Sequence, residues 1–207
     1  MPEIPFAKIC GITNIEDGVM SLELGAGMLG VVLSPLSPRM GSVDLVNKLK
    51  EIGATVATVH TDMESVISKA SGEDFVQLHF THGGPEISNV IRRTGKRVIS
   101  VVLNSNINEA IGEARQLLNQ GAAFALIDTG IPVSEAIGND HQIIGDHRIG
   151  IAGKISPENI HQVLAVKPGF VDASSRLELY PGKKNPIAVR RFMEVFRNET
   201  RTVQTYP

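Results

Sequence analysis

Short runs of Val and Ile alternate along this chain with longer segments in which apolar residues recur at helical spacing. The apolar runs predict eight β-strands, separated by roughly 20–26 residues, the length of one strand plus one helix. The strands are expected to begin near Phe6, Met28, Ala54, Asp74, Arg97, Ala123, Arg148 and Gly169. Helices are expected over residues 15–24, 43–52, 63–70, 85–93, 107–120, 157–164 and 187–197.

Capping residues support several of these limits. Asn14 and Ser42 precede two of the predicted helices, and their side chains can accept a hydrogen bond from the first helical turn. Ser156 is followed by Pro157 and Glu158, which predicts an N-cap, a proline at the first helical position and an acid in the first turn.

The segment between Thr129 and His147 is the least regular of the repeating units. Its pattern indicates only a short helix around residues 133–137, and the remainder is expected to form a long loop. Long loops in compact domains are often functional.

Eight strand–helix units in 207 residues predict a small α/β protein, a (β/α)8 TIM barrel in one domain over residues 1–207. Residues 198–207 form a polar C-terminal tail. A doubly wound sheet is the alternative, although such sheets have fewer strands. The loop after the first strand lacks the G-x-G-x-x-G pattern, so the sequence does not support dinucleotide binding there.

Composition narrows the class of protein. Hydrophobic residues make up 42% of the chain, and the formal net charge of −2 argues against a nucleic-acid-binding protein. We find neither a signal peptide nor an apolar run of about 18 residues, so no membrane association is expected. A single cysteine suits a reducing interior, and we expect a cytoplasmic protein.

The only cysteine stands at the end of the first predicted strand. Phe6, Lys8 and Cys10 alternate onto one face, which we expect to be the barrel interior, with Cys10 at the carboxyl-end mouth. A nearby Lys8 ammonium would lower the pKa of the thiol, which favours a catalytic thiolate. The alternative is a buried structural cysteine.

Other polar side chains end predicted strands in the same way. Asp128 ends an apolar strand, where its carboxyl should be partly desolvated. Such a carboxyl suits a general acid, and the alternative is that Asp128 braces the following loop. Asp172 has the same placement and could pair with Lys8 or brace its own loop. His79 is expected at the mouth, as a substrate contact or as a structural histidine.

Three loops carry candidate anion-binding groups. In such barrels the loops after strands 7 and 8 commonly bind phosphate, and here they supply Gly153, Lys154, Ser174, Ser175 and Arg176. The alternative is that these two loops are ordinary turns that bind no phosphate. Arg39 follows two prolines in the second loop, where a guanidinium could bind a carboxylate or simply lie on the surface. His141 and His147 lack metal-ligand spacing, and no metal site is expected.

Together these segments resemble the phosphoribosylanthranilate isomerase family of tryptophan biosynthesis. The resemblance runs in order over nearly the whole chain. It is carried by Lys8-Ile9-Cys10-Gly11-Ile12-Thr13-Asn14, Ser37-Pro38-Arg39, Val76-Gln77-Leu78-His79, Ala152-Gly153, Pro157-Glu158-Asn159, Val171-Asp172-Ala173-Ser174-Ser175, Glu178 and Pro181-Gly182-Lys183-Lys184.

The resemblance implies an Amadori rearrangement of N-(5-phosphoribosyl)anthranilate to 1-(2-carboxyphenylamino)-1-deoxyribulose 5-phosphate. It implies that Asp128 is the general acid, that Cys10 is the general base and that Arg39 holds the anthranilate carboxylate. No cofactor is implied, because the iminium intermediate is the electron sink. The expected partner is a small phosphorylated substrate, and the chain is expected to be a monomer or a homodimer.

The chain departs from the family pattern at three places. Lys154 and Arg176 stand where the family usually has glycine. The glycine-rich stretch expected after the sixth strand is absent, although Asp140 could match the acid that follows it. Two alternatives to the family's reaction follow: a related barrel acting on another phosphosugar, or a non-catalytic binding protein.

Overall fold

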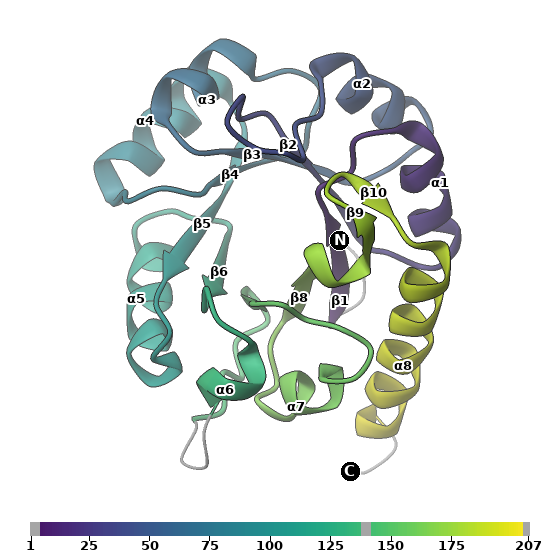
Figure 1. Cartoon of the computed structure of the whole chain (residues 1–207). Helices are drawn as coiled ribbons and strands as arrows, with labels where there is room; N and C mark the ends of the chain where they lie inside the picture. Colours follow the sequence, from purple (N-terminus) through teal and green to yellow (C-terminus); the bar gives the residue numbers. More distant parts are fainter. Residues whose placement is uncertain (1–4, 138–141, 205–207) are drawn as a thin grey trace.

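The computed structural model describes residues 5–137 and 142–204, and its centre is a closed barrel of eight parallel strands. The strands pair in sequence order, from β1 to β8 and back to β1, and the helices surround them (Figure 1). The strands are β1 (Phe6–Cys10), β2 (Met28–Val32), β3 (Val56–His60), β4 (Phe75–Leu78), β5 (Arg97–Leu103), β6 (Phe124–Asp128), β7 (Ile149–Ala152) and β8 (Phe170–Ala173). The predicted (β/α)8 barrel is therefore confirmed.

The helices alternate with these strands. They are α1 (Ile15–Glu23), α2 (Val43–Glu51), α3 (Met63–Lys69), α4 (Gly84–Thr94), α5 (Ile107–Asn119), α6 (Val133–Ile137), α7 (Ile160–Ala165) and α8 (Pro186–Gln204). The caps predicted for α1 and α2 are confirmed, because Asn14 accepts from the Asp17 amide and Ser42 from the Leu45 amide. No helix in the described part of the chain has the length and apolar character needed to cross a bilayer.

Two helix limits differ from the prediction. Helix α7 begins at Ile160 rather than residue 157, because residues 156–159 form a turn instead. In this turn the Glu158 amide donates to Ser156 Oγ at 3.3 Å, and the Ser156 amide donates to the Asn159 side chain at 2.8 Å. Helix α8 continues through most of the polar tail to Gln204.

Alternation along each strand creates two separate cores. Ala7 and Ile9 face outward and pack with the helices, whereas Phe6 faces inward with the apolar side chains of the other strands. Inside the barrel, Phe6 stacks on Phe170 at 5.1 Å between ring centroids, and Phe124 contacts both rings. This aromatic layer fills the lower interior, below Lys8 and Cys10 on β1.

A short hairpin between β8 and α8 escaped the prediction. A 3-10 turn, η1 (Ser175–Leu177), leads into β9 (Glu178–Tyr180) and β10 (Lys183–Lys184), which pair antiparallel. Lys183 and Lys184 form the second strand of this hairpin and precede the last helix. Lys184 is fully buried beside Glu178, and Lys183 pairs with Asp17 of α1 at 2.6 Å.

His60 lies buried between β3 and α3, outside the barrel interior. Its ring nitrogens contact the hydroxyls of Ser65 and Thr58. Burial, reinforced by the positive charge of Lys69, lowers the pKa of His60 to about 4. The folded protein therefore keeps His60 neutral at pH values where an unfolded histidine is protonated.

This shift predicts that the free energy of unfolding falls as the pH drops from about 6.5 toward 4. The unfolded state binds the proton first, so about 2 kcal/mol should be lost between pH 7 and 4.5. Denaturant unfolding of the wild type and His60→Gln across this range measures the difference. The variant should lose about 2 kcal/mol less, and parallel pH profiles would contradict the assignment.

Candidate active site

A cavity of about 410 Å³ opens at the carboxyl ends of the strands. It brings together most of the side chains singled out from the sequence, although they come from six different strand–loop units. Those that line it are Cys10, Arg39, His79, Asp128, Gly153, Lys154, Asp172, Ser174 and Ser175. The mouth predicted from strand phase is therefore where these residues meet.

Cys10 ends β1 and is nearly buried, with 9% of its surface exposed. It lies opposite Gly30 of β2. A Cβ on Gly30 would stand 2.6 Å from the Cys10 sulfur, a separation that real Cβ atoms do not show. The glycine on the neighbouring strand therefore makes the space that the thiol occupies.

Lys8 and Asp172 form an ion pair inside the barrel. The two residues are register partners across the β1–β8 seam, and Lys8 Nζ lies 2.6 Å from Asp172 Oδ2. Lys8 is fully buried, and Asp172 Oδ1 has no partner among the described residues. Burial opposes the charge of Lys8, but Asp172 and then Cys10 outweigh it and raise the pKa of Lys8.

The expectation that Lys8 would lower the pKa of Cys10 needs correction. Burial raises the pKa of the thiol, and the charge of Lys8 offsets this only in part because the Asp172 carboxylate acts in the opposite direction. Cys10 is therefore a neutral thiol at pH 7, and positive charge added next to the sulfur would favour the thiolate.

Asp128 ends β6 and presents one oxygen to the cavity. The Gly130 amide donates to Asp128 Oδ1 at 3.0 Å, while Oδ2 lies 3.8 Å from His79 Nε2. Both side chains are partly exposed, so each is accessible to a bound molecule. The placement of His79 predicted from the phase of the fourth strand is confirmed.

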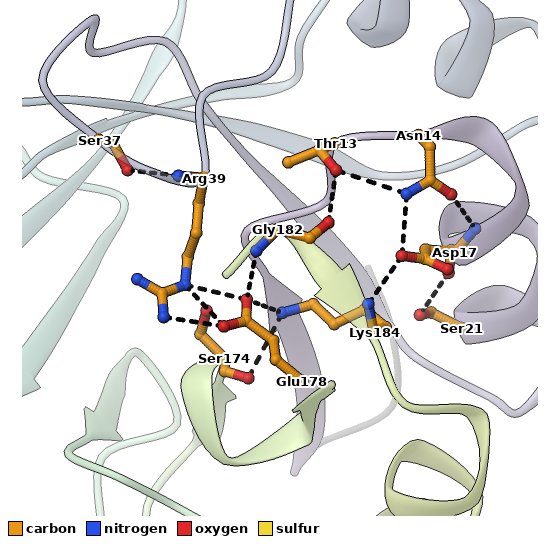
Figure 2. A network of polar contacts seen from close by, with 10 residues as sticks. All are labelled: Thr13, Asn14, Asp17, Ser21, Ser37, Arg39, Ser174, Glu178, Gly182 and Lys184. Atoms are coloured by element: carbon orange, nitrogen blue, oxygen red, sulfur yellow. Dashed lines mark hydrogen bonds and ion pairs between the residues drawn. The ribbon is translucent and has the colours of Figure 1, made fainter. Parts of the chain in front are cut away.

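Arg39 extends from the second loop to the cavity edge and pairs there with Glu178 of β9 (Figure 2). Its Nε lies 2.9 Å and 3.0 Å from the two carboxylate oxygens, and its Nη2 lies 2.8 Å from Oε2. Lys184 approaches the same carboxylate from the other side, at 3.0 Å (Figure 2). Arg39 is thus held by the protein rather than free on the surface.

The irregular segment after β6 is anchored on the loop after β7. A Cβ on Gly153 would stand 2.0 Å from Thr129 Oγ1, and the Val133 amide donates to the Gly153 carbonyl at 2.9 Å. Gly153 is therefore required for packing against this segment. The short helix predicted around residues 133–137 is confirmed as α6, whereas Asp140 and His141 lie outside the described residues.

Lys154, next to Gly153, has a φ of 48°, in the left-handed region that glycine adopts without penalty. Its ammonium has no ion-pair partner within residues 5–137 and 142–204. The lysine therefore keeps a strained backbone and presents an unpaired cation at the cavity.

Not every predicted site residue reaches the cavity. Lys8 lies one pleat below Cys10, and Arg176 is exposed on η1 without lining the cavity. The candidate list missed Gln77, which strand phase could have identified because it shares a face with His79. It also missed Thr61, Gly130 and Ser37. The described residues contain no cluster of three or more metal-ligating side chains.

A family model and curated relatives indicate the same family. The model of the N-(5'phosphoribosyl)anthranilate (PRA) isomerase family matches residues 7–195. An N-(5'-phosphoribosyl)anthranilate isomerase of Thermoplasma volcanium is 38% identical over 191 residues, covering 92% of this chain and 95% of its own length.

Two crystal structures with the same barrel are also similar to this chain. One contains monomers generated from the dimeric phosphoribosylanthranilate isomerase of Thermotoga maritima, with a TM-score of 0.73, 26% identity and coverage of 93% and 98% of the two chains. The other is a phosphoribosyl anthranilate isomerase bound to reduced 1-(o-carboxyphenylamino)-1-deoxyribulose 5-phosphate, with a TM-score of 0.71, 25% identity and the same coverage.

The backbone at Lys154 makes a prediction about stability. Glycine should relieve the left-handed strain, whereas alanine removes the charge and keeps the strain. Lys154→Gly should therefore unfold with a free energy about 0.5–1 kcal/mol higher than Lys154→Ala. Denaturant unfolding of the two variants measures this difference, and an alanine variant as stable as the glycine variant would contradict the backbone assignment.

Proposed function

The chain belongs to the N-(5'-phosphoribosyl)anthranilate isomerase family, and on that premise we propose that Cys10 and Asp128 are its general base and general acid. The family's enzymes convert N-(5-phosphoribosyl)anthranilate to 1-(2-carboxyphenylamino)-1-deoxyribulose 5-phosphate, a step of tryptophan biosynthesis, and this chain is such an isomerase. The alternatives of another phosphosugar substrate or a non-catalytic barrel are therefore set aside. The placement of Cys10 and Asp128 on one cavity is the observation that carries our assignment of roles.

The reaction begins at the ring oxygen of the sugar. Asp128 donates a proton to this oxygen, the C1–O bond breaks, and the nitrogen lone pair forms a C1=N iminium. His79, 3.8 Å from the carboxylate, faces the same proton-transfer site. The opened ring leaves a hydroxyl on the sugar and a positive charge beside C2.

The second step removes a proton from C2. Burial raises the pKa of Cys10, and the positive charge of the iminium favours its thiolate; the thiol proton passes to the Asp128 carboxylate, which the first step has left deprotonated. The Cys10 thiolate then takes the C2 proton, and the electron pair moves toward the iminium to give an enolamine. The enol then gives its proton up as C1 is protonated, and the ketone product forms without a net change in oxidation state.

The proton transfers need no cofactor, because the iminium accepts the electron pair that C2 releases. The thiol must stay reduced, so we place the reaction in the cytoplasm. One barrel domain over residues 1–207 carries the site. The relative from Thermotoga maritima is dimeric and has been converted to monomers, so a monomer or a homodimer fits this chain.

The substrate's two acidic groups have separate binding sites in this proposal. Arg39 holds the anthranilate carboxylate, and Asp172 Oδ1, which has no partner in the described structure, accepts from a sugar hydroxyl. The phosphate lies between the loops after β7 and β8, against Gly153, Lys154, Ser174 and Ser175. Arg176 contributes only from outside the cavity.

The acid and base assignments predict large losses of activity. Cys10→Ala and Asp128→Asn should each lower kcat by about 10²–10⁴-fold, because each removes one proton-transfer group. Loss of anthranilate-type fluorescence reports turnover. Folded variants that keep wild-type rates would contradict the roles, and a folded wild-type protein without turnover would contradict the function.

The phosphate site predicts a difference between the two cations that replace family glycines. Lys154→Ala should raise the inhibition constant of inorganic phosphate several-fold, since it removes an unpaired charge from the cavity. Arg176→Gln is the matched control and should leave this constant nearly unchanged. Equal effects of the two substitutions would contradict a phosphate site at Lys154.

A further inference from the structure

Arg39 uses only one edge of its guanidinium to bind Glu178. A guanidinium has five N–H donors in a planar fork, and Glu178 occupies Nε and one side of Nη2. Within residues 5–137 and 142–204, Nη1 and the second hydrogen of Nη2 have no partner, and Arg39 lines the cavity. The remaining edge can hold one carboxylate with two parallel hydrogen bonds.

Glu178 itself is fixed. Its side chain is only 3% exposed, and it accepts from Arg39, from Lys184 at 3.0 Å and from the Gly182 amide at 3.4 Å. Burial disfavours its charge, but Arg39 and Lys184 outweigh burial and lower the pKa of Glu178. The carboxylate therefore stays ionised and cannot easily turn toward the cavity.

The hairpin that carries Glu178 is tied to the segment after β1. The Lys184 amide donates to Asp17 Oδ2 at 2.8 Å, and the Thr13 hydroxyl donates to the Gly182 carbonyl (Figure 2). Glu178 is thus held in place relative to β1, the strand that ends in Cys10. Through Glu178, the guanidinium is positioned relative to the thiol.

We propose that Glu178 is a positioning residue that orients Arg39 for the substrate's carboxylate, and that Lys184 holds Glu178 in place. This inference rests on the proposed function, in which Arg39 binds that carboxylate. The charges agree with it, because the cations Arg39 and Lys184 and the anion Glu178 leave one positive charge. One substrate carboxylate balances that charge.

Two substrates separate this role from a structural one. The first is N-(5-phosphoribosyl)anthranilate, and the second is the N-glycoside of aniline with the same phosphorylated sugar, which lacks the carboxylate. Steady-state kinetics of both substrates, measured on the same sample, give a ratio of kcat/KM values. The fraction of folded protein cancels in this ratio, so partial unfolding cannot mimic the effect.

Glu178→Gln should lower the preference for the anthranilate substrate about tenfold, the scale of one charge-assisted hydrogen bond. The loss should lie mainly in KM of that substrate, because Arg39 binds a group remote from the reacting carbon. Turnover of the aniline substrate should be nearly unchanged. Lys183→Met, which removes a cation from the same hairpin without touching Arg39, should leave the ratio unaltered.

Four results would overturn the inference. Equal losses of kcat/KM with both substrates in Glu178→Gln would show that Glu178 is merely structural. A lower KM of this variant for the anthranilate substrate would show that Glu178 competes with the substrate carboxylate for Arg39. If Glu178→Gln does not fold, Lys184→Met takes its place, and an unchanged ratio in that variant contradicts the proposal. A wild type that turns over neither substrate overturns the proposed function as well.

Discussion

The ion pair between Lys8 and Asp172 joins the first strand to the last and lies between the aromatic layer and the cavity. Neither charge could be buried there alone, because removing one partner of a buried pair leaves an uncompensated charge. The pair determines how the thiol behaves. Burial raises the pKa of Cys10, and because the Asp172 carboxylate opposes the effect of Lys8, the ion pair only partly offsets this rise.

Much of the barrel and its mouth follows from strand phase. Each predicted strand start lies within two residues of the observed one, and alternation places Phe6, Lys8 and Cys10 on the interior face as expected. The side chains that end strands therefore meet at one mouth, even without knowledge of their contacts. The short hairpin could not be predicted in this way, because its charged residues have no hydrophobic pattern.

The remaining differences are three-dimensional properties. The direction of the Cys10 pKa depends on the balance between burial and two opposing charges, which the sequence near Cys10 does not contain. Arg39 was expected either to bind a carboxylate of the substrate or to lie on the surface, but Glu178, 139 positions later, holds one edge of its guanidinium. The start of the irregular segment after β6 is held against the next loop by Gly153, which packs on Thr129 and accepts from the Val133 amide.

Titration of the Cys10 thiol tests directly whether burial and the Lys8–Asp172 pair keep it protonated, because the chain has no other cysteine. Ultraviolet absorbance of the thiolate, taken as the difference from Cys10→Ser, removes the contribution of the two tyrosines. We expect a midpoint above the ordinary thiol value of about 8.5, and a lower midpoint in Asp172→Asn, where Lys8 is no longer opposed. A thiol already ionised at pH 7 without added substrate, or a midpoint that Asp172→Asn does not lower, would contradict this expectation.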